Sequence, residues 1–307
     1  MAYCTMKQTF SLCNQSLKIF ANFYRYDILI LSYCVLTVSS TGAVLFIVLL
    51  LYNQAYMYKG SNTMDKEKNI LLAKKYMVES IYRSANIEGI GMTFPETQTI
   101  CDGMSVSGHS LDEINAVNDL KNAWRWIFNN PDSDSGLDTL CQLNRIAGKF
   151  TVINAGSIRD MYDEPIRVPL YEGKDYYPPL PPNKDEINTI IKDTIQENKL
   201  DNALNLFCLV CKMQIFNDGN KRTATLFANM FMIQNGLGIL SIPVDKKLEF
   251  YNALTKYYDD DCNKELLKTF LKDYCITGNK AKDKTLSITI DEESVPDPTD
   301  DSDDIEP

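Results

Sequence analysis

The residues best suited to chemistry in this chain lie in one short segment, Gln214–Ala224. An apolar run precedes the segment, an Asn-Asp-Gly turn follows at 217–219, and a second helix is expected to begin at Asn220. The first amides of a helix have no intrahelical partner, and the helix dipole is positive there, so this end of a helix attracts anions. Gly219 would let the backbone approach such a ligand closely.

Three charged side chains around this turn indicate that the anion is a phosphate. Lys221 and Arg222 stand in the first turn of the expected helix, where the dipole disfavours positive charge, so their placement costs stability unless an anion is bound. Asp218 offers the hard oxygen ligand that Mg²⁺ prefers beside phosphates. By spacing alone, an ordinary Asn-Asp-Gly turn that joins two helices remains the alternative.

The composition excludes several other classes of protein. The chain has 307 residues and a net charge of −10, and its acidic end, 291–307, carries no base, so the footprint of a nucleic-acid-binding protein is absent. His109 is the only histidine, which excludes zinc sites built on several histidines, and we expect it to be a cap or surface residue. The cysteines are expected to be reduced thiols of a cytosolic domain, with Cys208 and Cys211 packed in a core.

Helices must position these residues, because apolar side chains recur at helical spacing through most of 64–277. Residues 166–176 alternate weakly around Glu172-Gly173, which predicts a β-hairpin, and a proline-rich extended exit follows at 177–182. The predicted fold class is therefore all-α with one small β-hairpin. Helices are expected at 64–84, 110–130, 183–198, 201–213, 220–234, 245–258 and 263–275.

The segment 214–222 resembles the signature of the Fic (Fido) family, H-x-F-x-[DE]-G-N-[GK]-R. The matching positions are Phe216, Asp218, Gly219, Asn220, Lys221 and Arg222. Ser84, Glu88 and Gly89 are similar to the family's inhibitory motif, [ST]-x-x-x-E-[GN], and they precede the core as in members with an N-terminal inhibitory helix. The stretch 166–182 resembles the hairpin flap of the family. Together these features cover about residues 69–275.

The resemblance implies a mainly helical Fic bundle that binds ATP with Mg²⁺ and transfers AMP to a protein hydroxyl of Ser, Thr or Tyr. Asp218 would hold Mg²⁺, and Arg222 would contact the β- and γ-phosphates. The remaining phosphate contacts would come from Gly219, Asn220 and Lys221. The target chain would be held in extended form, as an added strand, by flap residues including Tyr171, Tyr176 and Tyr177.

Three positions depart from the family pattern. Gln214 stands where the family has its catalytic His, and a carboxamide cannot act as a base near neutral pH, which typically costs ~10²–10⁴ in rate. Gln214 could still orient a hydroxyl, so we take Gln214 and Arg222 as the candidate catalytic residues. Thr225 replaces a second Arg that usually pairs with the inhibitory Glu, so Glu88 would need Lys221 or Arg222 as its partner. The Lys221 form also occurs in Doc toxins, which phosphorylate their target.

These departures leave three functions open. The first expectation is a protein adenylyltransferase that lacks the usual catalytic His and is inhibited by Glu88. The alternatives are a catalytically impaired, nucleotide-binding Fic module that acts as a regulator, and a Doc-like protein phosphotransferase. The target protein and association with a second copy of the chain are not determined by the sequence.

The flanking segments carry further predictions. Residues 28–52 contain no charged side chain and are long enough to span a bilayer, so a membrane anchor with a cytoplasmic Fic domain is predicted. If translation starts at Met64, the protein is instead expected to be cytoplasmic. The acidic, proline-bearing end is expected to be disordered. The predicted organisation is an N-terminal segment (1–27), a transmembrane helix (28–52), an inhibitory-helix region (64–100), a Fic/Fido domain (101–277) and an acidic tail (281–307).

Overall fold

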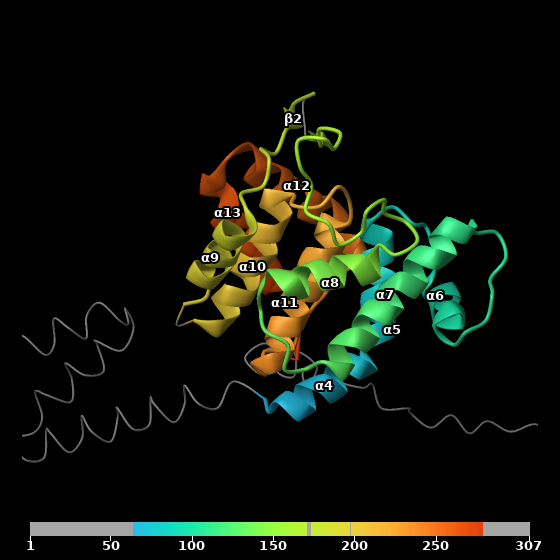
Figure 1. The fold of residues 1–307 in the computed structure, drawn as a ribbon. Coiled ribbons are helices and arrows are strands. Elements are labelled where there is room, and N and C mark those ends of the chain that lie inside the picture. Colours follow the sequence, from blue (N-terminus) through green and yellow to red (C-terminus); the bar gives the residue numbers. More distant parts are fainter. Residues whose placement is uncertain (1–63, 171–172, 197, 279–307) are drawn as a thin grey trace, which may run out of the picture. The chain divides into compact units, whose positions relative to one another are not determined.

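The protein is described by a computed structural model over residues 64–170, 173–196 and 198–278. Regular structure in these ranges is mainly helical, as predicted (Figure 1). The helices before the hairpin are α4 (Lys66–Lys75), α5 (Met77–Ile87), α6 (Phe94–Cys101), α7 (Leu111–Asn129) and α8 (Leu137–Ala147). Those after it are α9 (Lys184–Thr194), α10 (Lys199–Met213), α11 (Asn220–Gln234), α12 (Lys247–Asp259) and α13 (Lys264–Tyr274), with 3₁₀ turns η1 (Val244–Lys246) and η2 (Asp261–Asn263).

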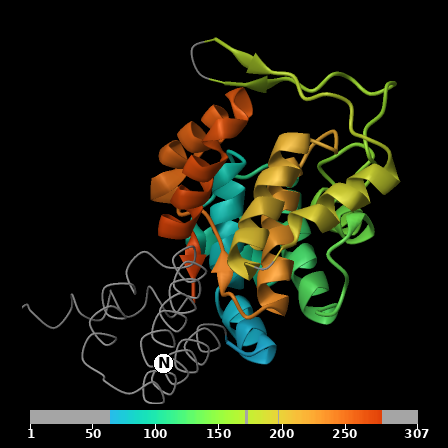
Figure 2. The ribbon, with the colours of Figure 1, turned by 90° about the vertical axis from the view of Figure 1, so that its left-hand side faces the viewer.

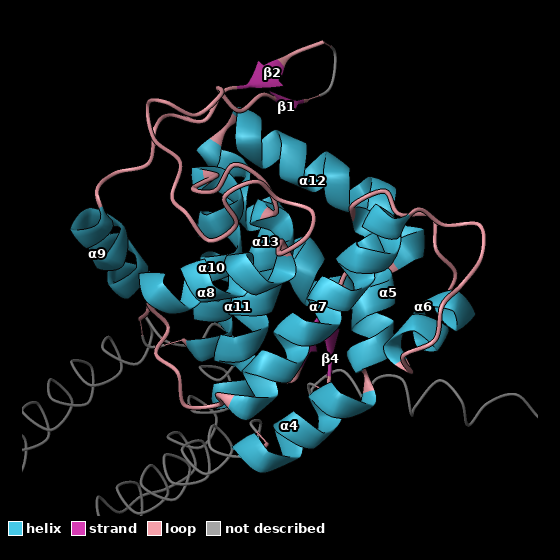
Figure 3. Ribbon diagram, turned by 45° about the vertical axis from the view of Figure 1, so that its right-hand side comes forward, coloured by secondary structure: helices cyan, strands magenta, loops and turns pink. Residues whose placement is uncertain are grey.

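Helix α11 forms the centre of the bundle. Every residue from Arg222 to Ile233 is buried, which is expected of a helix that is surrounded on all sides. Helix α10 packs along α11, while α4, α7 and α8 cover its other faces (Figure 3). Only residues 214–219 join α10 to α11, so the predicted anion site lies at the junction of the two central helices.

Two short antiparallel strand pairs complete the described fold. Strands β1 (Val168–Pro169) and β2 (Asp175–Tyr176) form the predicted hairpin, with Val168 opposite Tyr176. Figure 2 shows this hairpin extending beyond the ends of the helices. Strands β3 (Ile239–Leu240) and β4 (Ile276–Thr277) pair near the other end of α11.

The predicted helix boundaries differ from the observed ones in three places. The helix expected at 64–84 is two helices, because the backbone leaves helical geometry at Tyr76, and this break lets α4 pack on α11 and α5 on α7. The helix expected at 183–198 ends at Thr194, since Ile195 is extended. Helices α6 and α8 were not predicted; α6 begins with a capping box and a proline, which is a readable signal.

Several predictions concern residues beyond the described ranges. Across 64–170, 173–196 and 198–278, no helix has both the length and the apolar character needed to cross a membrane. The predicted span at 28–52 lies outside those ranges, as do the N-terminal segment and the acidic tail at 281–307. The membrane anchor, the cytoplasmic placement and the domain limits therefore stay predictions.

Candidate nucleotide-binding site

The turn between α10 and α11 has two residues in the left-handed backbone region. Gln214 caps α10 at φ 46°, and Gly219 caps α11 at φ 76°. Asn220 holds the turn between them: its amide nitrogen donates to the Phe216 carbonyl (2.7 Å), and its amide oxygen accepts from the Phe216 N–H (3.0 Å). The buried Phe216 ring anchors the turn in the core. The turn is therefore fixed before any ligand binds.

A second amide side chain, Asn144 of α8, supports the same turn from outside. Its nitrogen donates to the Asp218 carbonyl (3.1 Å) and to Thr223 Oγ1 (3.0 Å). A Cβ added at Gly219 would lie 3.3 Å from this nitrogen and 3.5 Å from Arg222 Nη2, so only glycine suits the position at this positive φ. Asn144 therefore joins the turn to the first turn of α11 and fixes their relative position.

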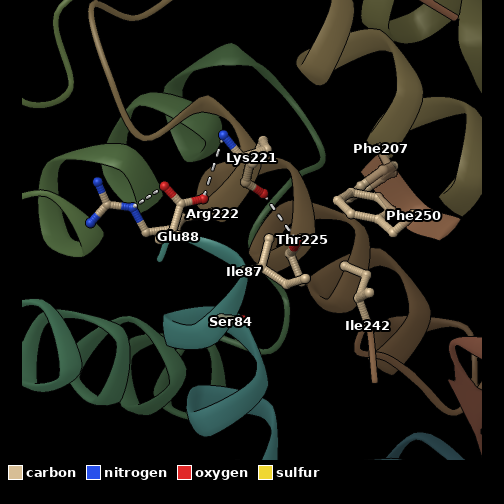
Figure 4. Close-up of a pocket in the computed structure, with 9 residues that line it drawn as sticks. All are labelled: Ser84, Ile87, Glu88, Phe207, Lys221, Arg222, Thr225, Ile242 and Phe250. Carbon is tan, nitrogen blue, oxygen red and sulfur yellow. Dashed lines mark hydrogen bonds and ion pairs between the residues drawn. The ribbon is translucent and has the colours of Figure 1, made fainter. Parts of the chain in front are cut away.

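Two cations at the start of α11 face one carboxylate. Glu88 Oε1 lies 3.8 Å from Lys221 Nζ, and Glu88 Oε2 lies 3.8 Å from Arg222 Nε (Figure 4). Arg222 is also held from behind, since its Nη1 donates to the Ala147 carbonyl and to Thr151 Oγ1, both at 3.2 Å. The guanidinium is thus positioned by protein on one side and faces Glu88 on the other.

The end of α5 places Glu88 by a helix-termination motif. Glu88 is the C-cap, Gly89 follows at φ 91°, and the Ile90 N–H bonds to the Ala85 carbonyl (3.0 Å), which is the Schellman pattern. Helix α12 clamps this end, because the Tyr251 hydroxyl donates to the Ile87 carbonyl (2.6 Å). Ser84, one turn earlier, lines the same pocket as Glu88. The end of α5 therefore brings Ser84 and Glu88 to the pocket, and Gly89 terminates the helix that carries them.

The Glu88–Arg222 contact satisfies charge but not hydrogen bonding. Glu88 Oε1 and Arg222 Nε are buried atoms without a hydrogen-bond partner, and the pocket between them has a cavity volume of about 10 Å³, room for one water molecule at most. Burial alone lowers the pKa of Lys221, but the negative charge of Glu88 together with other nearby groups outweighs burial and raises it. Lys221 therefore remains charged, and the Glu88 carboxylate stands between it and Arg222.

Asp218 is an exposed carboxylate beside Arg222 at the N-terminus of α11. Its side chain is 64% exposed; Oδ1 accepts from the Gly219 N–H (2.5 Å), and Oδ2 lies 3.8 Å from Arg222 Nη2. The described residues contain no group of three or more side chains that could hold a metal ion by themselves. One exposed carboxylate beside a phosphate site fits Mg²⁺ carried in by a nucleotide, because Mg²⁺ takes few protein ligands in such sites.

Gln214 differs from Arg222 in that both of its amide N–H groups and its amide oxygen have hydrogen-bond partners in the protein. Its amide nitrogen donates to the Cys211 carbonyl (2.7 Å) and the Tyr258 hydroxyl (3.2 Å), and its oxygen accepts from Asn220 Nδ2 (3.0 Å). Burial raises the pKa of Tyr258 well above its usual range, so this phenol stays neutral. The Gln214 amide is therefore held as a structural cap, with both of its N–H groups directed to protein acceptors.

The flap is attached to the site through Tyr176. The Tyr176 ring stacks on Tyr258 (centroids 5.2 Å apart, 11° between planes), and its hydroxyl donates to the Lys212 carbonyl (2.9 Å). Tyr177 is 61% exposed, whereas Tyr171 lies outside the described residues. The structure thus gives the predicted flap residues different surroundings: one is an anchor and one is exposed.

Arg159 is a site residue that the sequence analysis missed. Its Nε donates to the Gln214 carbonyl (2.6 Å), and its Nη2 donates to the carbonyls of Pro178 (3.3 Å) and Pro179. It therefore joins the α10–α11 turn to the exit of the flap. No local pattern marks such a residue, whereas Asn144 carried a readable signal: a polar residue on the apolar face of its helix, beside Leu140 and Leu143.

Two other predictions concern residues away from the turn. His109 lies beside Glu96 (3.4 Å) and Glu113 (3.6 Å) near the start of α7, so it takes part in a capping cluster. Cys208 and Cys211 are buried free thiols, and burial raises the pKa of Cys208 to about 12. Both cysteines pack in the core, as predicted.

The mainly helical fold and the candidate anion site at the N-terminus of α11 can be compared with known proteins. Residues 134–232 match the Fic/DOC family. Protein adenylyltransferase fic-1 of Caenorhabditis elegans is 24% identical over 187 residues, which cover 57% of this chain and 35% of that protein. Protein adenylyltransferase Fic of Drosophila mojavensis is 27% identical over 197 residues, which cover 59% of this chain and 36% of that protein. The chain spans about a third of the length of these curated relatives.

Solved structures share the fold. Fic-1 of Caenorhabditis elegans superposes with a TM-score of 0.52 at 18% identity, covering 82% of this chain and 77% of that one. A Fic family protein from Desulfovibrio desulfuricans superposes with a TM-score of 0.57 at 17% identity, covering 81% and 76% respectively. Residues 134–232 of this chain form a Fic/DOC family domain, as its signature predicts.

Proposed function

We propose that this Fic/DOC domain binds Mg·ATP at the α10–α11 turn and transfers AMP to a hydroxyl group of a target protein. The observation that carries the proposal is a pair of cations at the N-terminus of α11, the half-buried Lys221 and the buried Arg222, both turned toward a carboxylate that forms no hydrogen bond with them. Phosphate oxygens suit these cations better, because a phosphate offers more acceptors than one carboxylate. The names of the relatives support AMP as the transferred group.

Glu88 is proposed to inhibit the domain. Its carboxylate lies between Lys221 and Arg222, in the position where the phosphates would be neutralised. A polyphosphate that entered beside Glu88 would meet negative charge in a small, largely water-free pocket, where such repulsion is strong. ATP binding therefore requires the end of α5 to yield, or the Glu88 carboxylate to turn away.

In the proposed reaction, the hydroxyl oxygen forms a bond to the α-phosphorus, and pyrophosphate leaves as the bond to its bridging oxygen breaks. Arg222 and Lys221 neutralise charge on the phosphates during this step. Asp218 would hold Mg²⁺, which supplies further charge neutralisation when it is bound. The hydroxyl proton is lost to water, because Gln214 has no basicity, so we expect the transfer to be slow.

The flap is proposed to hold the target. Strands β1 and β2 form a two-stranded ribbon with an open edge, and an extended target segment could pair with such an edge through its main chain. Tyr176 keeps the ribbon attached to α12, and exposed residues such as Tyr177 are free to contact the target. The target is then a protein with a Ser, Thr or Tyr hydroxyl in an extended segment.

A second function, nucleotide binding without transfer, is favoured by one observation. All hydrogen-bonding groups of the Gln214 amide except one oxygen lone pair are used within the protein, so this side chain has no N–H left to orient a hydroxyl. Such a protein would act as a regulator whose nucleotide state depends on Glu88.

The two functions separate in one experiment on the full chain. Mg·ATP binding is measured by calorimetry, and the same samples are incubated with candidate target proteins and ATP labelled at the α- or the γ-phosphate. The variant Glu88→Gln removes the inhibitory charge, and Glu79→Gln on the same helix is the matched control. Transfer of α-label supports AMP transfer, and transfer of γ-label alone supports phosphotransfer. Binding without transfer in every sample supports the regulator, whereas no binding in either variant contradicts the nucleotide site.

A further inference from the structure

A basic groove lies between α7 and α8, apart from the nucleotide site. It has a volume of about 520 Å³ and is lined by Asn122, Arg125, Trp126, Asn129, Arg145, Ile146 and Lys149. The four α7 residues are spaced i, i+3, i+4 and i+7, so they form one stripe along the helix. We call this surface the α7–α8 groove.

The groove carries three cations that form no salt bridge in the part of the chain that the structure describes, although the charge of one of them, Lys149, acts on the buried Asp119 carboxyl. None of the seven described residues that line it is acidic, and Arg125, Arg145 and Lys149 form no salt bridge with any residue in the described ranges. Arg145 donates to the neutral Gln142 side chain, and Lys149 Nζ lies 4.8 Å from the Phe150 ring. The positive charge of Arg125 and Arg145 is therefore available to an outside ligand, whereas that of Lys149 is shared with Asp119.

The rest of the lining suits a peptide rather than a free ion. Trp126 and Ile146 are half-buried and give the groove an apolar floor, while Asn122 and Asn129 are exposed and offer amide groups that can donate to or accept from a main chain. An acidic segment with scattered apolar residues matches such a surface. The chain contains one at 291–307: nine of its residues are acidic, none is basic, and it includes Val295 and Ile305.

Helix α4 connects the last described residue with the end of α7 that carries Asn129. Gly278 packs against Leu72 of α4. Two residues further along α4, Lys74 Nζ lies 5.7 Å from the ring of Phe128, which precedes the groove residue Asn129. The linker 279–290 can span up to about 40 Å at ~3.3–3.6 Å per residue, so residues 291–307 can reach beyond α4.

We propose that residues 291–307 dock in the α7–α8 groove of the same chain. Opposite charge draws the acidic segment to Arg125, Arg145 and Lys149, and the short linker keeps its local concentration high. Because the contacts are exposed, the docking is salt-sensitive. The inference does not depend on the proposed nucleotide chemistry, since within the described ranges no groove side chain forms a hydrogen bond or salt bridge with residues 214–219.

The test is zero-length carbodiimide crosslinking of the full chain at low salt, followed by mass spectrometry of the peptides. This reagent joins a lysine amine to a carboxylate with which it is in contact. We expect a crosslink between Lys149 and an acid of 291–306, at least tenfold more abundant than any to Lys192, an exposed lysine of α9 outside the groove. It should appear in the monomer and fall severalfold in 0.5 M salt.

Two variants make the test specific. The pair Arg125→Glu with Arg145→Glu leaves Lys149 in place and should reduce the crosslink at least fivefold. The pair Lys192→Glu with Lys256→Glu changes the net charge equally at exposed positions outside the groove and should leave it unchanged. Exchanging Asp300, Asp301, Asp303 and Asp304 for Asn leaves the folded domain untouched and should also reduce it. Equal loss in both charge-reversal pairs, a crosslink only between two copies, or no crosslink at Lys149 would overturn the proposal.

Discussion

The two ends of the α10–α11 turn are built in opposite ways. At the carboxyl end of α10, both N–H groups of the buried Gln214 amide and its oxygen have protein partners. At the amino end of α11, Nε of the equally buried Arg222 has no hydrogen-bond partner. Glu88 Oε1, which faces Lys221, has none either. Gln214 and Arg222 are both 7% exposed, so burial does not account for the difference in their hydrogen bonding.

The comparison indicates which end of the α10–α11 turn is suited to bind a ligand. An unpartnered buried polar atom costs free energy, on the order of 1–3 kcal/mol, and is tolerated where a ligand or a conformational change can satisfy it. Arg222 and Glu88 therefore form a poised contact, whereas Gln214 belongs to the framework. In the proposed site, the Arg222 end would be open to phosphate, and the Gln214 end would offer no group for proton transfer.

The largest effect is expected from restoring a base. Gln214→His in a Glu88→Gln background should raise the rate of AMP transfer by ~10²-fold, the low end of what a general base contributes. Histidine tolerates the left-handed backbone at this position better than most residues. The check is α-label transfer at saturating Mg·ATP, with Mg·ATP affinity measured in parallel. An unchanged rate with unchanged affinity would mean that the lack of a base at position 214 does not limit transfer.

The next largest effect is expected on Mg·ATP binding when the Arg222 guanidinium is removed. Arg222→Met should weaken Mg·ATP binding by ~30-fold or more, because removing one member of a buried charge contact costs 2–5 kcal/mol. Calorimetry measures this directly, and Arg125→Met on the outer face of α7 is the control that should bind normally. Equal affinity of the two variants would show that the nucleotide does not reach α11.

A smaller effect is expected from Glu88, and it should depend on Arg222. Glu88→Gln should tighten Mg·ATP binding by ~10-fold, since the repulsion between the carboxylate and the phosphates disappears. In an Arg222→Met background the gain should shrink severalfold, because the two groups act on the same phosphates and their effects are not additive. A full tenfold gain in both backgrounds would show that Glu88 acts without Arg222.

The smallest effect is expected on the pH dependence of stability, through the Tyr258 hydroxyl that pairs with Gln214. Burial raises the pKa of Tyr258 in the folded protein, so its contribution to stability is complete below about pH 10 and is lost as pH rises further. Tyr258→Phe should melt a few degrees lower at pH 7, because it leaves one Gln214 N–H unpaired. Between pH 9 and 11 its melting temperature should then fall less than that of the unaltered protein. Exposed Tyr177→Phe should match the unaltered protein at every pH.

Much of the fold could be predicted from local signals. The capping boxes at Ser110 and Asn183 begin helices as predicted, and the helix at 220–234 is found with those limits. The break at Tyr76 could not be predicted, because it depends on the separate surfaces that α4 and α5 cover. Strands β3 and β4 are two residues each and pair across a long stretch of chain, so neither has a pattern of its own.

By itself the sequence determined the signature at 214–222, the absence of a histidine there, and the presence of Ser84, Glu88 and Gly89 before the core. These are properties of residue type and spacing, which short-range chemistry can interpret. Only the tertiary structure decided that Glu88 lies near both Lys221 and Arg222. It also decided that the Tyr258 hydroxyl accepts a hydrogen bond from the Gln214 amide, and that Arg159 joins the turn to the flap. Those contacts join residues far apart in the chain, and their positions follow from how the helices pack around α11.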